Sequence, residues 1–226
     1  MTLAERLATG LGEARLTVLG GFAVSVDEPG FPPGTRSLLM IGPAEPGFWD
    51  HFTQSPEWLD GSANPLDRWS RRVIGRLACD LGGKALFPFG GPPYHPFFQW
   101  ALRTGRAWQS PVRLLVQADQ GLLVSFRGAL ALREAVDLPT PMARPCDTCA
   151  APCLTACPAG ALDAAGYDVP ACHDWLDGPR GPACLNGGCL TRRACPLSQA
   201  YARLPEQSAY HMQVFHAGWR DRKAQE

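Results

Sequence analysis

Eight of the nine cysteines in this chain lie within one stretch of fifty residues. In chain order they are Cys146, Cys149, Cys153, Cys157, Cys172, Cys184, Cys189 and Cys195. A cluster this dense needs a chemical explanation. Three are available: disulfide bonds, zinc sites or iron–sulfur clusters.

Disulfide bonds require an oxidising compartment. The segment Met1–Arg6 lacks a basic region followed by an apolar core, so we expect no secretory signal, reduced thiols and a cytoplasmic protein. No apolar run has membrane-spanning length, so no membrane association is expected. Residues 1–143 carry 13 basic and 13 acidic side chains, and residues 144–226 carry 8 of each. This balance offers no basic surface for nucleic acid.

The spacing of the first four cysteines favours iron and sulfide over zinc. Zinc sites usually combine two separated pairs of ligands. Here four cysteines form one run, from Cys146 to Cys157, which ends in Cys-Pro. The bacterial ferredoxin pattern is C-x2-C-x2-C-x3-C-P, and this run differs from it by one extra residue before the third cysteine. Zinc and disulfides remain the alternatives.

Counting ligands predicts two four-iron clusters. In the ferredoxin pattern three close cysteines bind one cluster, whose fourth ligand is a remote cysteine followed by proline. The first predicted set is therefore Cys146, Cys149, Cys153 and Cys195. The second set takes the remaining four, Cys157, Cys172, Cys184 and Cys189. The alternative is one cluster plus structural thiols, because the spacing of the later cysteines is irregular.

The first part of the chain predicts a mixture of helices and strands. A capping box at Thr2–Glu5 begins a helix that Gly10 and Gly12 should end. The apolar stretches 16–26, 37–41 and 128–132 are typical of strands. A second helix should begin at Pro65 after an Asn64 cap, with Leu66, Trp69, Val73 and Leu77 as its buried stripe. Residues 42–63 were expected to form a loop.

Two further features concern the middle of the chain. Residues 111–117 and 122–126, joined by a turn, predict a β-hairpin. The prolines of residues 138–145 indicate an extended linker. We therefore predict an α+β fold with an N-terminal domain, 1–138, that holds a cofactor or a partner, and a cluster domain, 139–226, that includes a C-terminal tail.

Outside the cluster region the sequence identifies few functional residues. Cys79 is expected to be a buried small apolar residue. Tyr94, His95 and Asp119 are loop residues near a possible pocket, and no catalytic residue is assigned. The tail, with His211, His216 and Trp219, could either fold back on the body or lie on the surface.

Three features of the cysteine region resemble the epoxyqueuosine reductases and related corrinoid-dependent reductases. These are the Cys-x2-Cys followed by Cys-x3-Cys-Pro, the segment Ala171–Leu176, and Gly188-Cys189 before Cys195-Pro196. The resemblance implies a nitroreductase-like α+β domain that holds cobalamin, followed by a small ferredoxin-like domain with two 4Fe-4S clusters. It also implies the ligand sets counted above, and tRNA as a partner of a queuosine enzyme.

The chain departs from that family in two places. Where the family has a cysteine three residues after Gly-Cys, this chain has Arg192, which leaves Cys184 as the substitute ligand. No stretch matches the family's active site with its proton-donating aspartate. Residues 107–111 stand near the expected place.

Three functions are therefore carried forward. The first is an iron–sulfur electron-transfer protein whose two clusters pass electrons to a redox partner protein or to a cofactor in the first domain. The second is a corrinoid- or flavin-dependent reductase, or a cobalamin-processing protein, in which the clusters supply a cofactor with electrons. The third is a structural zinc module that acts in recognition.

Overall fold

The computed structural model describes residues 1–223, except for the side chain of Arg222. The chain is a mixed α+β protein that forms two compact units. The first unit comprises residues 1–108 and 125–143, and the second comprises residues 109–124 together with the chain from 144 onward. None of the described helices is both long and apolar enough to cross a membrane.

The last of the three crossings between the units, at residues 143 and 144, falls within the predicted proline-rich linker. The predicted boundary, by contrast, kept residues 109–124 with the N-terminal part of the chain. Residues 109–124 lie between two segments of the first unit, so a single domain boundary could not assign them to the second unit.

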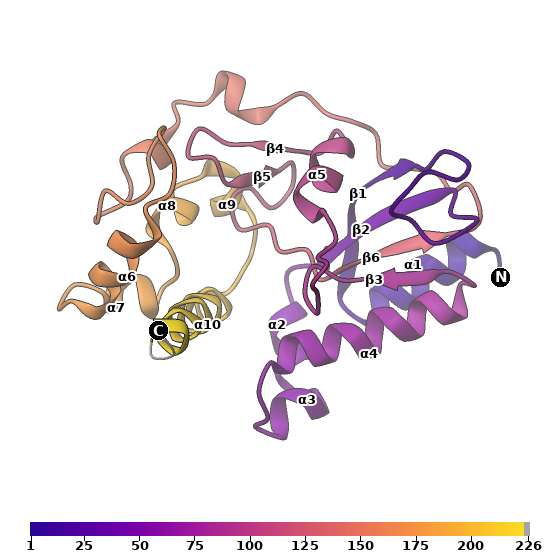
Figure 1. The fold of residues 1–226 in the computed structure, drawn as a ribbon, viewed down its shortest axis with the longest axis horizontal. Coiled ribbons are helices and arrows are strands. Elements are labelled where there is room, and N and C mark those ends of the chain that lie inside the picture. The colour runs from indigo at the N-terminus through magenta and orange to yellow at the C-terminus, as the bar shows by residue number, and fades with distance from the viewer. Residues whose placement is uncertain (224–226) are drawn as a thin grey trace. The chain divides into compact units, whose positions relative to one another are not determined.

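The first unit contains most of the regular structure (Figure 1). Its elements are α1 (Leu3–Glu13), β1 (Leu16–Ala23), β2 (Ser37–Pro43), α2 (Phe48–Thr53), α3 (Pro56–Leu59), α4 (Pro65–Asp80), β3 (Lys84–Leu86), α5 (Phe97–Arg103) and β6 (Gly128–Leu132). The strand β4 (Ala107–Gln109) lies at the border of the units and pairs with β5 (Leu115–Gln117).

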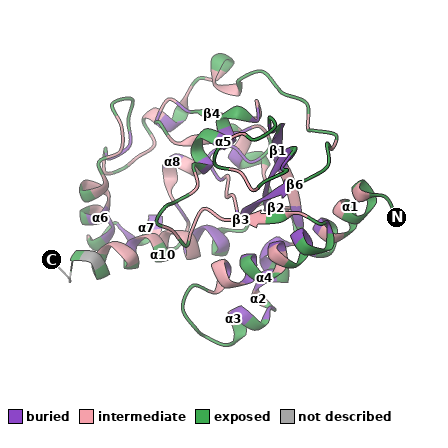
Figure 2. Cartoon of the chain, turned by 45° about the vertical axis from the view of Figure 1, so that its right-hand side comes forward, coloured by how far each residue is buried: buried purple, intermediate pink, exposed green. Residues whose placement is uncertain are grey.

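A four-stranded antiparallel sheet with the order β1-β2-β6-β3 forms the core of the first unit. Every residue of β2 and β6 is buried, as Figure 2 shows, and Leu39 of β2 pairs with Leu130 of β6. The strands predicted over 16–26, 37–41 and 128–132 are thus present, although β1 ends at Ala23. Their continuous apolar character follows from burial on both faces of the sheet.

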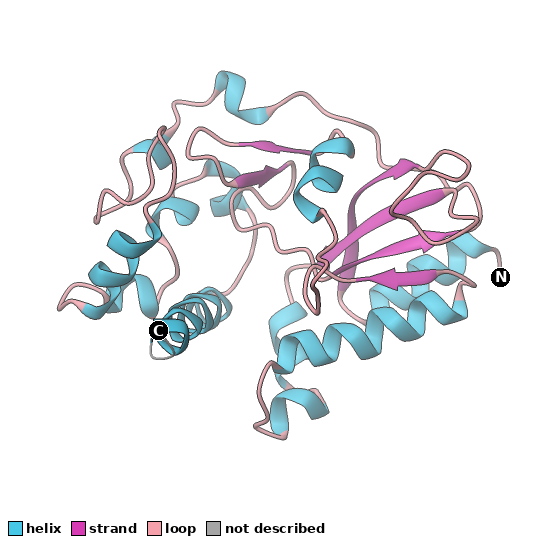
Figure 3. Ribbon diagram, viewed as in Figure 1, coloured by secondary structure: helices cyan, strands magenta, loops and turns pink. Residues whose placement is uncertain are grey.

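Two helices, α1 and α4, run side by side along this sheet (Figure 3). They approach closely at Gly10, where a Cβ atom would lie 2.6 Å from Cδ1 of Leu77. The Arg6 guanidinium of α1 also donates a hydrogen bond to the Asp80 carbonyl oxygen, at 2.8 Å. The predicted capping box of Thr2 and Glu5 is confirmed. The predicted stop at Gly10 is wrong, because Gly10 serves this close helix packing and α1 continues to Glu13.

The helix α4 begins at Pro65 as predicted. Asn64 precedes it with a φ of 53°, a left-handed conformation, instead of the extended backbone of a side-chain N-cap. Leu66, Trp69 and Leu77 are buried as predicted, whereas Val73 is only half-buried and the neighbouring Ile74 is buried instead. The opposite face carries ion pairs of arginines, namely Arg68 with Asp60, Arg72 with Glu57 and Arg76 with Asp80.

Residues 42–63 form two short helices, α2 and α3, instead of the expected loop. Phe48, Trp49 and Phe52 of α2 are buried, and the ring of Phe48 meets that of Trp69 edge to face at 5.5 Å. The helices were missed because each is too short to display a helical period. Cys79 is exposed, which corrects the prediction that it is buried.

A truncation in the central strand should strongly destabilise the first unit. Leu130 of β6 is fully buried between β2 and β3. Leu130→Ala should reduce the free energy of unfolding by about 2–5 kcal/mol, because the lost methyl groups leave a cavity. Urea unfolding followed by circular dichroism measures this change. Leu59→Ala is the control: Leu59 is 71% exposed, so its truncation should change the free energy by less than about 0.5 kcal/mol.

The second unit is built mainly from short elements. They are β5, the 3-10 helices η1 (Pro145–Thr148) and η2 (Pro152–Leu154), and the helices α6 (Val169–Asp177), α7 (Pro182–Leu185), α8 (Leu190–Arg193), α9 (Pro196–Ala200) and α10 (Pro205–Lys223). Most of them begin with a proline in the first turn, which suits that position because proline lacks the N–H that would be unpaired there.

The predicted hairpin over 111–126 is wrong in its second half. The strand β5 pairs with β4, and residues 122–126 run as turn and coil. The backbone there is hydrogen-bonded to distant side chains: the Leu123 N–H donates to Ser198 Oγ at 3.2 Å, and Arg203 donates to the Leu123 carbonyl oxygen at 2.7 Å. Tertiary contacts therefore override the strand propensity of this segment.

The C-terminal tail forms α10, which packs on α6 and α7 of the same unit. His173 of α6 and His216 of α10 meet through their Nδ1 atoms at 2.9 Å, and His216 Nε2 lies 3.1 Å from Asp177 Oδ1. The ring of His173 also stacks on that of Trp219 at 4.7 Å. Of the two alternatives, the tail therefore folds back on the cysteine-rich unit.

Candidate metal centre

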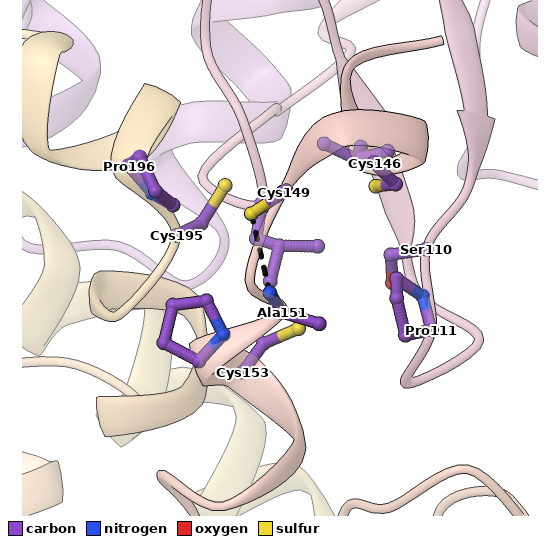
Figure 4. A pocket seen from close by; sticks show the side chains of 11 residues that line it. Ser110, Pro111, Cys146, Cys149, Ala151, Cys153, Cys195 and Pro196 are labelled. Atoms are coloured by element: carbon purple, nitrogen blue, oxygen red, sulfur yellow. Dashed lines mark hydrogen bonds between the residues drawn. The ribbon is translucent and has the colours of Figure 1, made fainter.

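The first predicted set of cysteines lines one cavity in the second unit (Figure 4). Cys146 and Cys149 come from η1 and its end, Cys153 from η2, and Cys195 from the position before α9. All four side chains border the same space, which opens in part to solvent and has a cavity volume of about 20 Å³. A cavity needs roughly 10–15 Å³ of such volume to hold one water molecule, so the space between the four side chains is small.

The surroundings of this cavity are mostly apolar. The residues that complete its lining are Ser110, Pro111, Val116, Leu122, Ala151, Pro152 and Pro196. The Ala151 N–H donates to Cys149 Sγ at 3.4 Å, and the backbone N–H groups of Cys153 and Leu154 act on the Cys153 thiol. Ala151 is held in a left-handed conformation, with a φ of 51°, directly before η2. The tight turn between Cys149 and Cys153 thus supplies hydrogen bonds to cysteine sulfurs.

The thiols of this set influence one another electrostatically. Burial raises the pKa of Cys146, the Arg144 charge opposes that change, and the neighbouring thiolates of the set raise the pKa further. Burial and the nearby Cys195 likewise raise the pKa of Cys153. Cys153 and Cys195 are buried and Cys146 and Cys149 are half-buried, so four thiolates in this place could not stay charged together without a compensating cation. The donor set is therefore suited to a thiolate-bound metal.

The second predicted set is also brought together. Its members are Cys157 after η2, Cys172 on α6, Cys184 on α7 and Cys189 before α8. Burial raises the pKa of Cys172, and the charges of Cys189, Cys157 and Cys184 raise it further. Burial also raises the pKa of Cys184. The charges of Cys189 and Cys157 raise this pKa further, and the charge of Arg193 opposes them.

The four cysteines of the first set thus border one cavity, and those of the second set lie near enough for their charges to interact, whereas the division into two ligand sets stays a prediction. Within residues 1–223, no three histidine, cysteine, aspartate or glutamate side chains are arranged to hold a single metal ion. The cysteines of the first set border a cavity instead of meeting at one point.

A hydroxyl group lies beside the second set. The Tyr167 side chain is hydrogen-bonded to Cys172, and burial together with this bond raises the pKa of Tyr167 well above its usual value. The position of Tyr167 is fixed by an antiparallel bridge to Leu162 and by Asp168, whose side chain caps α6 by accepting from the Ala171 N–H at 3.0 Å. The sequence analysis missed Tyr167. Its place just before the helix that carries Cys172 was the available signal.

Arg192 has a structural role where the resembling family has a cysteine. Its guanidinium donates a hydrogen bond to the Leu122 carbonyl oxygen at 2.6 Å. Cys184 lies close enough to Cys157 and Cys189 for their charges to interact, and its role as the substitute ligand stays a prediction. Arg192 therefore helps to hold the excursion 109–124 within the cysteine-rich unit.

Gly121 allows this excursion to approach the cysteine-rich segment. It has a φ of +58°, and an added Cβ atom would lie 2.5 Å from the Ser198 nitrogen and 3.0 Å from Cys195 Sγ. Gly121→Ala should destabilise the second unit by about 2–5 kcal/mol, since a left-handed alanine costs about 1–2 kcal/mol and overpacking about 1–3 kcal/mol. Urea unfolding measures the loss.

Gly160→Ala is the matched control for that prediction. Gly160 lies in the same unit with a φ of +63°, and an added Cβ atom there would meet open space. Gly160→Ala should therefore reduce the free energy of unfolding only by the cost of a left-handed alanine, about 1–2 kcal/mol. Equal losses from the two variants would mean that the contact of Gly121 with the Cys195 segment is unimportant.

The loop residues considered from the sequence do not form a recognisable site. Tyr94 is largely exposed, and His95 stacks on Trp100 at 5.4 Å within the first unit. Asp119 belongs to the second unit, where its carboxylate accepts from Gln117 Nε2 at 3.0 Å. These positions assign no catalytic role to the three residues.

Comparison with known proteins adds no relative to this description. No protein-family model, curated protein or solved structure matches the chain. The arguments about function therefore rest on the residues of the chain and their arrangement.

Proposed function

We propose that the second unit binds two 4Fe-4S clusters and that the protein transfers electrons to a redox partner protein or to a cofactor held by the first unit. The observation that carries the proposal is the gathering of eight cysteines into two separate groups of four. Each group offers the four thiolates that a cubane requires. On this proposal the second unit is a ferredoxin-like domain.

Two local features support iron and sulfide over a single zinc ion. The run from Cys146 to Cys157 follows the ferredoxin spacing closely and ends in Cys-Pro. The N–H group of Ala151 also faces Cys149 Sγ, and hydrogen bonds to the sulfurs are one means by which proteins adjust these clusters.

The chain between the two sets keeps the clusters close together. Cys153 of the first set and Cys157 of the second are four residues apart. Their Cα atoms can therefore be separated by at most about 14 Å, because an extended chain advances about 3.5 Å per residue. An electron entering one cluster could pass directly to the other, so the pair would work as a relay.

The first unit would complete the protein as a docking or cofactor domain. Its α+β sheet is compatible with the nitroreductase-like fold that the resemblance implies, and that fold remains part of the proposal. In the related reductases such a domain would hold cobalamin. The proposal treats a bound corrinoid as the alternative outcome of the experiment below.

Measurement of iron, acid-labile sulfide and zinc in protein purified without oxygen tests this proposal. Two cubanes require about eight iron and eight sulfide ions per chain. About four of each would leave one cluster and contradict the two-cluster assignment, and zinc without sulfide would overturn the redox function. A change in the visible spectrum on adding cobalamin would favour the corrinoid-dependent reductase over the electron carrier.

A further inference from the structure

Ser110 is a buried polar residue at the cavity of the first set. It is 4% exposed, and its Oγ has no hydrogen-bond partner among the residues that the structure describes. The residue lines the same cavity as the four cysteines, and Figure 4 shows it on the wall near Cys146. A buried hydroxyl without a partner is destabilising, so such a group usually has a function.

The backbone around Ser110 holds it firmly at this wall. Its N–H donates to the Leu114 carbonyl oxygen at 2.8 Å, and its own carbonyl oxygen accepts from the Arg113 N–H at 2.9 Å. The preceding carbonyl, that of Gln109, accepts from Arg144 at 2.9 Å. The backbone N–H and carbonyl groups around Ser110 thus have hydrogen-bond partners. The Ser110 hydroxyl is therefore available to donate to a group bound in the cavity.

Tyr167 is the corresponding residue of the second set. Its hydroxyl is hydrogen-bonded to Cys172, and its ring lies 6.3 Å from that of Phe215 on α10. Since a thiolate can only accept, the tyrosine must be the donor when Cys172 is a metal ligand. Ser110 thus lies beside the first set of cysteines and Tyr167 beside the second, and the two hydroxyl groups come from different parts of the chain.

We infer that Ser110 and Tyr167 donate hydrogen bonds to the sulfurs of the first and second clusters, respectively, and that each raises the reduction potential of its own cluster. This inference rests on the proposed function. A hydrogen bond to sulfur stabilises negative charge, and the cluster gains one negative charge when it accepts an electron. The bond is therefore stronger in the reduced state. No covalent bond forms or breaks, and no proton leaves the hydroxyl.

Redox titration of the anaerobic protein, followed by electron paramagnetic resonance, tests the inference. Ser110→Ala should lower the midpoint potential of one cluster and Tyr167→Phe that of the other. For each, we expect about a tenfold change in the ratio of reduced to oxidised cluster at a given potential, which is about 59 mV for one electron. Cys189→Ser and Cys149→Ser, which should keep only the first and only the second cluster, assign each signal.

Two further variants separate a hydrogen bond from a general structural effect. Ser110→Thr keeps a hydroxyl and should keep the wild-type potential. Ser198→Ala removes a hydroxyl near Cys195 that already lies 3.4 Å from the Gln120 carbonyl oxygen, so it should leave both potentials unchanged. The hyperfine coupling of an exchangeable proton near the first cluster should disappear in Ser110→Ala and persist in Ser110→Thr.

The outcomes distinguish this inference from the function on which it rests. Clusters present with unchanged potentials in both Ser110→Ala and Tyr167→Phe would overturn the inference and leave the electron-transfer function standing. Equal shifts of both clusters by either variant would also overturn it, because each hydroxyl is assigned to one set. Protein that lacks iron and sulfide would overturn the proposed function together with the inference.

Discussion

Cys149→Ser should remove about half of the bound iron, and Cys189→Ser should remove the other half. Cys149 belongs to the set that lines the cavity, whereas Cys189 acts on Cys172 and Cys184 in the other set. Each cubane has its own four thiolates, so loss of a ligand from one need not empty the other. Iron and sulfide analysis of the anaerobically purified variants measures this, and the remaining spectra should differ because different clusters survive.

Cys79→Ser is the matched control for these variants. Cys79 is exposed and belongs to the first unit, so its replacement should leave the iron content unchanged. Cys184→Ser adds a sharper test, because this residue stands in for the ligand that Arg192 replaces. It should give the same partial loss as Cys189→Ser. If Cys149→Ser or Cys189→Ser removed all of the iron, or none, the division into two sets would be wrong.

The grouping of the cysteines could be predicted from the sequence because it depends on short-range spacing. The run from Cys146 to Cys157 spans a few turns of chain, and the Cys-Pro at its end separates the fourth residue from the first three. Counting then assigned Cys195 to the first set, and the structure places it beside the same cavity. The other four cysteines were assigned to the second set by elimination. In the structure the charges of Cys189, Cys157 and Cys184 act on Cys172.

The hydroxyl groups could not be predicted, because long-range contacts determine their positions. Ser110 reaches the cavity only because residues 109–124 join the second unit. Hydrogen bonds from Arg192 to Leu122 and from Arg203 to Leu123 hold this segment. The partners are 70 and 80 residues apart in the sequence. Local pattern predicted a hairpin there, since the apolar residues that face the cysteines resemble those of a strand.

The strands of the first unit, by contrast, could be predicted from the sequence. The strands β2 and β6 are buried over their full length, so their apolar runs are unbroken and easily recognised. The helices α2 and α3, with six and four residues, are too short to display a period. For the same reason the short helices around the cysteines carry little signal of their own apart from proline at their starts.

Removal of the metal should unfold the cysteine-rich segment and spare the first unit. The elements η1, η2, α7, α8 and α9 have three to five residues each, which is too few for stable isolated helices. Half of the buried apolar residues between 144 and 200 are themselves cysteines, since the full set is Cys153, Ala161, Leu162, Leu176, Cys184 and Cys195. On the proposed function, sulfur–metal bonds would supply much of the stability of this segment.

Hydrogen exchange before and after anaerobic removal of iron with a chelator measures this effect. Backbone amides of residues 144–200 should lose nearly all protection, whereas those of β2 and β6 should keep theirs, because their core contains Leu38, Leu39, Ile41 and Leu130 with at most 1% exposure. Leu130→Ala should show the reverse pattern, with weaker protection in the sheet and an intact iron content. Full protection of 144–200 in iron-free protein would contradict the prediction, because the short helices would then be stable without the metal that their cysteines are proposed to bind.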